Sequence, residues 1–142
     1  MNALIQKYDV PGDDFSYAGE ASGQVKRTLK KLGYDPDTIR RVSIAMYEGE
    51  INMVIHAKGG KALVEIYSDC IKVLLEDEGP GIKDIAMAMQ EGYSTAPEYV
   101  RSLGFGAGMG LPNIKKFTDE LNIDSELGKG TKVYFTVKVK EK

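Results

Sequence analysis

Three polar side chains recur at four-residue intervals in one stretch of the sequence, among several apolar residues and a further glutamate, Glu50: they are Glu48, Asn52 and His56. If this stretch is helical, with about 3.6 residues per turn, the three side chains lie along one flank of the helix. A carboxylate between apolar neighbours is costly unless another group meets it. A metal-bound ligand or a catalytic proton transfer would satisfy Glu48, and so would a polar seam completed by neighbouring loops. His56 alone is also compatible with a structural role near a helix end.

A second candidate lies at Asp77, which ends an apolar run and is followed by Gly79 and Gly81. Glycines allow another group to approach the backbone closely. A carboxylate can accept a hydrogen bond from an exocyclic amino group, such as that of adenine. The segment is therefore suited to recognise the edge of a base, although the same pattern also occurs in ordinary turns.

A third candidate is a segment of alternating glycines that directly precedes an expected helix. Backbone N–H groups in such a segment can face an anion, and the helix N-terminus adds the positive end of its dipole. No Gly-Lys-Ser/Thr follows, so it is not a Walker A loop, and no strand leads directly into it, as a dinucleotide fingerprint requires. We interpret it as a phosphate cradle, with a flexible loop lacking any ligand as the alternative. Its residues are Gly104, Gly106, Ala107, Gly108, Met109, Gly110 and Leu111.

The helix that would position Glu48 is expected to start at Asp35-Pro36-Asp37 and to extend to Ala57. Its polar line lies between two apolar stripes, of which the first is expected to face a sheet. The first stripe comprises Ile39, Val42, Met46, Met53 and Ala57, and the second Ile44, Ile51 and Ile55. The solvent face is expected to hold Arg40, Ser43, Glu50 and Lys58. In this helical arrangement the side chain of Glu50 is expected to be exposed to solvent, so Glu50 can serve as a control for Glu48.

The remaining elements follow from apolar periodicity and from Gly and Pro positions. Strands alternating with helices in this way predict an α/β (α+β) two-layer sandwich, with a mixed, mostly antiparallel sheet and helices on one face. Strands are expected at Ala3–Val10, Lys61–Ser68, Cys70–Glu76 and Thr131–Val139, helices at Glu20–Leu32 (capped by Gly33), Lys83–Gln90 and Leu111–Leu121, and a long loop at Glu91–Met109.

Composition limits the function classes. The length of 142 residues suits a single domain spanning 1–142, and a net charge of −2 provides no basic excess for binding nucleic acid. No apolar run approaches the roughly 20 residues that span a bilayer. The N-terminus lacks the features of a signal peptide, and Cys70 is the only cysteine, which excludes an intrachain disulfide. We therefore expect a cytoplasmic protein that binds neither nucleic acid nor membrane.

Taken in order, these elements resemble the GHKL superfamily of ATP-binding domains, which includes gyrase, heat-shock chaperones, histidine kinases and mismatch-repair ATPases. Glu48-x-x-x-Asn52 is similar to its N box and Asp77-x-Gly79-x-Gly81 to its first glycine box. The lid glycine box is matched by Gly106-x-Gly108-x-Gly110-Leu111, and the final box by Gly128-Lys-Gly130-Thr131. In that box a strand threonine lies near the adenine-binding aspartate.

Within the superfamily the chain most resembles the anti-sigma-factor serine/threonine kinases, the RsbW, RsbT and SpoIIAB group, whose sequences are similar at Glu91-Gly-Tyr-Ser-Thr before the lid. The resemblance implies that Asn52 holds Mg²⁺, that Asp77 recognises adenine and that Glu48 acts as general base. It also implies a supporting role for His56 near the phosphates of ATP.

The leading hypothesis is thus a protein kinase that phosphorylates a serine of a small anti-sigma-antagonist-like protein, with a sigma factor as a further expected partner. One alternative is a module that uses ATP only as a conformational ligand and sequesters a regulator. Another is a slow ATPase whose lid closure drives assembly. An intact histidine kinase is not expected, because the only histidine, His56, lies inside the N box, whereas a detached histidine-kinase ATPase fragment is compatible with the sequence. The family often dimerises, so a homodimer is compatible with the resemblance.

Overall fold

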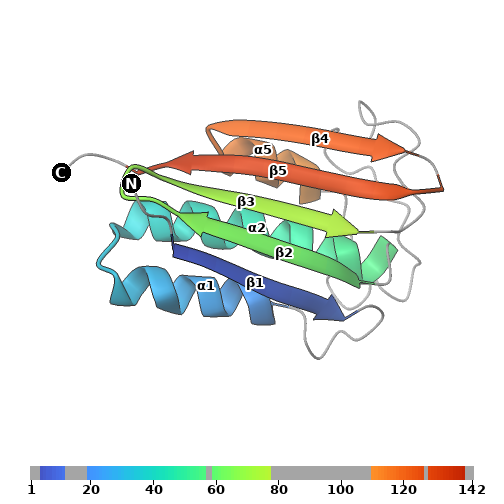
Figure 1. The fold of residues 1–142 in the computed structure, drawn as a ribbon. Helices are drawn as coiled ribbons and strands as arrows, with labels where there is room; N and C mark the ends of the chain where they lie inside the picture. The colour runs from blue at the N-terminus through green and yellow to red at the C-terminus, as the bar shows by residue number, and fades with distance from the viewer. Residues whose placement is uncertain (1–3, 12–18, 57–58, 78–109, 127, 140–142) are drawn as a thin grey trace, which may run out of the picture.

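The computed structural model describes residues 4–11, 19–56, 59–77, 110–126 and 128–139, with the backbone alone at 11, 55, 56, 110 and 126. These residues form a five-stranded sheet in the order β1-β2-β3-β5-β4, and every strand pair in it is antiparallel. All labelled helices lie on one face of this sheet (Figure 1). The predicted two-layer fold is therefore confirmed, with a sheet that is wholly antiparallel in the described part of the chain.

The elements match most of the predicted ranges to within a few residues. The strands are β1 (Leu4–Pro11), β2 (Gly59–Ile66), β3 (Cys70–Asp77), β4 (Glu120–Glu126) and β5 (Gly130–Lys138). The helices are α1 (Glu20–Lys31), α2 (Pro36–His56) and α5 (Gly110–Phe117). The predicted helix at Lys83–Gln90 and the predicted loop at Glu91–Met109 lie outside the described residues.

The connection between α1 and α2 follows from local sequence. Gly33 adopts a left-handed conformation (φ 84°), as predicted for a residue that ends a helix. The N–H of Tyr34 then donates to the carbonyl oxygen of Leu29 at 3.1 Å, which closes the last turn of α1. Asp35 caps the N-terminus of α2, because its carboxylate accepts a hydrogen bond from the N–H of Thr38 at 2.9 Å.

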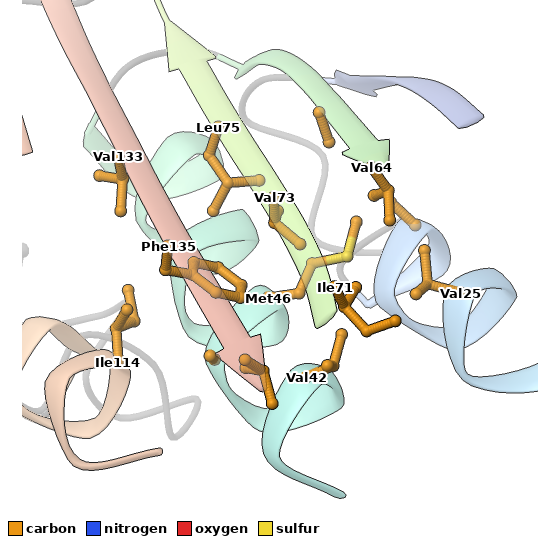
Figure 2. Close-up of a cluster of buried hydrophobic side chains, with 14 of the residues drawn as sticks. Val25, Val42, Met46, Val64, Ile71, Val73, Leu75, Ile114, Val133 and Phe135 are labelled. Carbon is orange, nitrogen blue, oxygen red and sulfur yellow. The ribbon is translucent and has the colours of Figure 1, made fainter. Parts of the chain in front are cut away.

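One hydrophobic core fills the space between the sheet and the helices. Figure 2 shows side chains from α1, α2 and α5 packed against the inward-facing residues of β2, β3 and β5. Phe135, at the centre of β5, is fully buried, as is Met46 on α2. The predicted core stripe of α2 is confirmed for Ile39, Val42, Met46 and Met53, all buried, while Ala57 lies outside the described residues.

The predicted helix at Leu111–Leu121 is too long. α5 ends at Phe117, and Glu120–Glu126 forms β4 at the edge of the sheet, where no strand was predicted. Asp119 lies between α5 and β4 and already bonds to the sheet. Its N–H donates to the carbonyl oxygen of Thr136 at 2.9 Å, and its carboxylate accepts from the N–H of Lys138. The alternation of half-buried Leu121 and Ile123 with exposed neighbours is the period of a strand and was the missed signal.

None of the helices in the described residues is both long and apolar enough to cross a bilayer.

Candidate active site

The candidate residues gather toward one end of the sandwich. The last residue of β3, the first residues of β5 and the C-terminal end of α2 lie at the same end of the molecule (Figure 1). Gly60 lies between α2 and the end of β3. A Cβ built on it would meet Sδ of Met53 at 2.9 Å and Cα of Asp77 at 3.1 Å. Met53 follows Asn52 directly in α2, so the absence of a side chain at Gly60 lets the Asn52 turn of α2 and the end of β3 approach each other.

Glu48 lies half-buried in the middle of α2, on the polar line that the sequence predicts. Its Oε1 accepts a hydrogen bond from Nδ2 of Asn113, on α5, at 3.4 Å. Burial raises the pKa of the Glu48 carboxyl, and the hydrogen bond from Asn113 acts in the opposite direction by stabilising the ionised form. A carboxylate in such surroundings is a stronger proton acceptor at neutral pH than a solvent-exposed glutamate.

Asn52 lies one turn beyond Glu48 and is also half-buried. His56 is the last residue of α2, and its side chain is outside the described part of the chain. The predicted binding residues of the two glycine-rich loops, up to residue 109, are outside it as well, so their roles stay predictions. These are Gly79, Gly81, Gly104, Gly106, Ala107, Gly108 and Met109.

Asp77 and Thr131 are neighbours in the sheet, as the resemblance implies. They face each other across β3 and β5, and the N–H of Thr131 donates to Oδ1 of Asp77 at 3.2 Å. Thr131 is buried, and its hydroxyl lies 2.9 Å from the Ser125 hydroxyl of β4. The backbone N–H of Thr131 in β5 therefore helps to hold the Asp77 carboxylate, which is half-buried.

The last glycine of the cradle, Gly110, is the first residue of α5, and Leu111 is buried beneath it in the core. Asn113 lies in the first turn of this helix and is not among the site residues predicted from the sequence. A polar residue placed between the buried residues Leu111 and Ile114 was the available signal. What the sequence could not give is that this turn packs against α2 beside Glu48.

The position predicted for Glu50 is wrong. Its side chain is only 1% exposed, and its two carboxylate oxygens accept hydrogen bonds from the N–H groups of Gly19, Ala21 and Ser22, each at 3.1 Å. Glu50 thus caps the N-terminus of α1, where no side chain of α1 itself forms a capping hydrogen bond. A helix wheel gives the direction of each side chain but not the element that covers it: α1 covers Glu50, whereas Arg40 on the same predicted face is exposed.

The residues present fit a metal that arrives with a nucleotide. Among the described residues no three His, Cys, Asp or Glu side chains cluster as a metal site. The amide side chain that α2 places on its polar line is Asn52. Mg²⁺ keeps several waters and is commonly bound through one or two protein ligands together with substrate phosphates. Asn52 would then be the protein ligand to Mg²⁺, which would neutralise phosphate charge when bound.

The sequence profile of the Histidine kinase-, DNA gyrase B-, and HSP90-like ATPase family matches residues 38–141. Serine/threonine-protein kinase RsbT from Bacillus subtilis is 33% identical over 118 residues, covering 80% of this chain and 83% of that protein. An anti-sigma F factor from Clostridium novyi is also 33% identical over 118 residues, covering 79% of each. The expected family and its anti-sigma kinase relatives are therefore confirmed.

Two solved structures share the fold. The RsbU and RsbW domains of Rv1364c from Mycobacterium tuberculosis match with a TM-score of 0.65 and 17% identity, covering 100% of this chain, which spans 34% of that one. The mycobacterial sensor histidine kinase MprB matches with a TM-score of 0.54 and 15% identity, and the match covers 98% of this chain and 100% of that one. With a family profile that matches most of its length, the chain belongs to the Histidine kinase-, DNA gyrase B-, and HSP90-like ATPase family.

Proposed function

We propose that this protein transfers the γ-phosphoryl group of ATP to a serine or threonine hydroxyl of a partner protein. The observation that carries the proposal is Glu48, a half-buried carboxylate whose pKa is raised by burial, one helical turn from Asn52. The relative from Bacillus subtilis, which is named a serine/threonine-protein kinase, supports the same reaction class. The relative named anti-sigma F factor supports a sigma factor as one partner, and the family resemblance implies that the acceptor is an anti-sigma-antagonist-like protein.

In the proposed reaction, Glu48 accepts the proton of the acceptor hydroxyl as that O–H bond breaks. The hydroxyl oxygen forms a bond to the γ-phosphorus, and the bond between this phosphorus and the β–γ bridging oxygen breaks, which releases ADP. Asp77 would hold the adenine amino group, and Asn52 would hold Mg²⁺, which would neutralise phosphate charge when bound. The glycine-rich segment and the N–H groups at the start of α5 neutralise the phosphates, with His56 in support.

The test is transfer from radiolabelled ATP by wild type and by Glu48→Gln. Incubation with the proteins of the source cells identifies the labelled acceptor and the phosphorylated residue type. We expect Glu48→Gln to lose at least about 100-fold in transfer rate, within the range for a general base, while its calorimetric affinity for ATP stays within a factor of about three. Transfer by Glu48→Gln at the wild-type rate would refute the assignment.

Two variants complete this experiment. Asp77→Asn should weaken ATP binding, because an amide cannot replace a carboxylate as acceptor from both Thr131 and adenine without turning a donor toward one of them. Glu120→Gln is the matched control, because Glu120 is an exposed residue on the edge strand β4. It should bind ATP and transfer phosphate as wild type does.

The alternative of an ATP-dependent sequestering module is favoured by the relative named anti-sigma F factor. It predicts that Glu48→Gln and wild type bind the partner equally and that neither transfers label to it. A cytoplasmic location and a homodimer remain expectations of the same proposal.

A further inference from the structure

The N-terminal half of α5 meets α2 beside the proposed base. Ile114 of α5 is fully buried, and its Cδ1 lies 3.7 Å from the place that a Cβ of Gly49 would occupy. Gly49 follows Glu48 and Ile114 follows Asn113, so the close approach at Gly49 brings the Asn113 amide to the Glu48 carboxylate. The measured distance is 3.4 Å, from Nδ2 of Asn113 to Oε1 of Glu48.

A second contact fixes the other end of the same helix. Nε of Arg41 donates to the carbonyl oxygen of Phe117 at 3.2 Å, and Arg41 also pairs with Asp119 at 2.8 Å. Since α5 is only eight residues long, contacts at Asn113, Ile114 and Phe117 hold it along its length. The Asn113 amide is therefore presented to Glu48 from a helix whose position the rest of the fold determines.

We propose that Asn113 is a positioning residue for phosphoryl transfer, which donates to Oε1 of Glu48 and so directs Oε2 toward the acceptor hydroxyl. This inference rests on the proposed function of Glu48 as base. A carboxylate on a long side chain can adopt several rotamers, and a hydrogen bond to one oxygen fixes the plane of the group. Orientation of this kind affects the rate of the chemical step more than the binding of substrate.

Two opposing effects on the pKa of Glu48 agree with the positioning role proposed for Asn113. Burial raises the pKa of the carboxyl, and the only other effect on it within the described residues is the hydrogen bond from Asn113, which lowers the pKa. A donor at this position therefore favours the ionised carboxylate, which is the form that can accept a proton.

The experiment compares Asn113→Asp, Asn113→Leu and Asn113→Gln with wild type, using ATP and the acceptor protein that radiolabelling identifies. Asp keeps the shape of Asn but replaces the donor with a second negative charge beside Glu48. Leu removes the donor without adding charge, and Gln keeps the donor on a longer chain. We expect Asp and Leu to lower kcat about tenfold, which corresponds to one orienting hydrogen bond. ATP affinity and the midpoint of thermal unfolding should change little, and Gln should recover part of kcat.

Lys115→Gln, at an exposed position of α5, is the control and should match wild type. In a Glu48→Gln background, Asn113→Leu should cause no further loss of residual transfer, because the two residues act as a unit. Full kcat in Asn113→Leu with an inactive Glu48→Gln overturns this inference alone. A loss of kcat that persists undiminished in the Glu48→Gln background also overturns it. Absence of a labelled acceptor, or wild-type transfer by Glu48→Gln, overturns the proposed function as well.

Discussion

At the scale of single residues, Glu48 and Glu50 show how two positions along a helix separate two tasks. Glu48 faces α5 and is half-buried, and among the described residues one amide, that of Asn113, donates to it. Glu50 is fully enclosed and accepts three backbone N–H groups. A carboxylate with three donors is stabilised in place, whereas one with a single donor keeps lone pairs for a substrate. The three donors to Glu50 suit a structural role, and the single donor to Glu48 suits a catalytic role.

Glu50→Ala should destabilise the protein by about 3 kcal/mol or more, because it leaves three N–H groups at the buried start of α1 without their charged acceptor. Chemical denaturation measures this loss. Glu20→Ala is the control, since Glu20 is exposed in the same turn of α1, and should change stability by no more than about 0.5 kcal/mol. Similar denaturation midpoints for the two variants would contradict a capping role for Glu50.

At the scale of elements, the packing of α2 depends on Gly49. A Cβ built there would overlap Cδ1 of Leu75, in β3, and would also contact Ile114 of α5. The glycine thus lets the helix approach the sheet and α5 together, next to Glu48. Local propensity disfavours glycine inside a helix by about 1 kcal/mol, so this position is set by packing and not by helix formation.

Gly49→Ala should therefore destabilise the protein by about 1–3 kcal/mol, the usual cost of overpacking, despite its gain in helix propensity. Gly23→Ala in α1 is a matched control, because a Cβ there would meet only Nη1 of Arg27, at 3.6 Å. That variant should be neutral or more stable by up to about 1 kcal/mol. If both alanines stabilise the protein in thermal unfolding, the close approach at Gly49 is not required.

At the scale of the whole molecule, one polar cluster joins three distant parts of the chain. The Asp119 carboxylate accepts from the N–H of Lys138 at 2.6 Å and from Arg41 at 2.8 Å. Burial opposes ionisation of Asp119, but these hydrogen bonds and the Arg41 charge outweigh it and lower the pKa below the ordinary value of 3.8. The cluster connects α2, the start of β4 and the end of β5.

Because the folded-state pKa of Asp119 is depressed, its contribution to stability is present above the unfolded pKa, near 3.8, and is lost as the pH falls through the folded value. Asp119→Asn should cost about 1 kcal/mol at pH 7, a modest amount because the carboxylate is partly exposed. The difference from wild type should shrink below about pH 4. A difference that is constant with pH would mean that the charge of Asp119 does not contribute.

A second prediction at this scale concerns magnesium. The proposed function makes Asn52 the single protein ligand to Mg²⁺ on α2. Calorimetric titration of Mg²⁺ into nucleotide-free protein should then show no saturable binding, whereas ATP should bind more weakly once EDTA removes the metal. Asn52→Ala should remove most of this metal dependence while leaving the unfolding midpoint close to that of wild type. Tight binding of Mg²⁺ to the protein alone would contradict delivery of the metal by the nucleotide.

The sequence by itself determined the fold class, most element boundaries and the polar line of Glu48 and Asn52, because these follow from periodicity, from caps such as Gly33 and from local spacing. It also pointed to the pair of Asp77 and Thr131 through the family resemblance. The alternation that marks β4 is present in the sequence at Leu121 and Ile123, although the apolar pattern before it also favours a longer helix.

Only the tertiary structure decided which side of α2 is covered and by what. The burial of Glu50 depends on α1, and the amide of Asn113 reaches Glu48 only because α5 packs against α2 at Gly49. These contacts join residues that lie from 28 to 65 positions apart along the chain. Pattern within one segment cannot specify them, because they arise from the way the segments bury their apolar faces together.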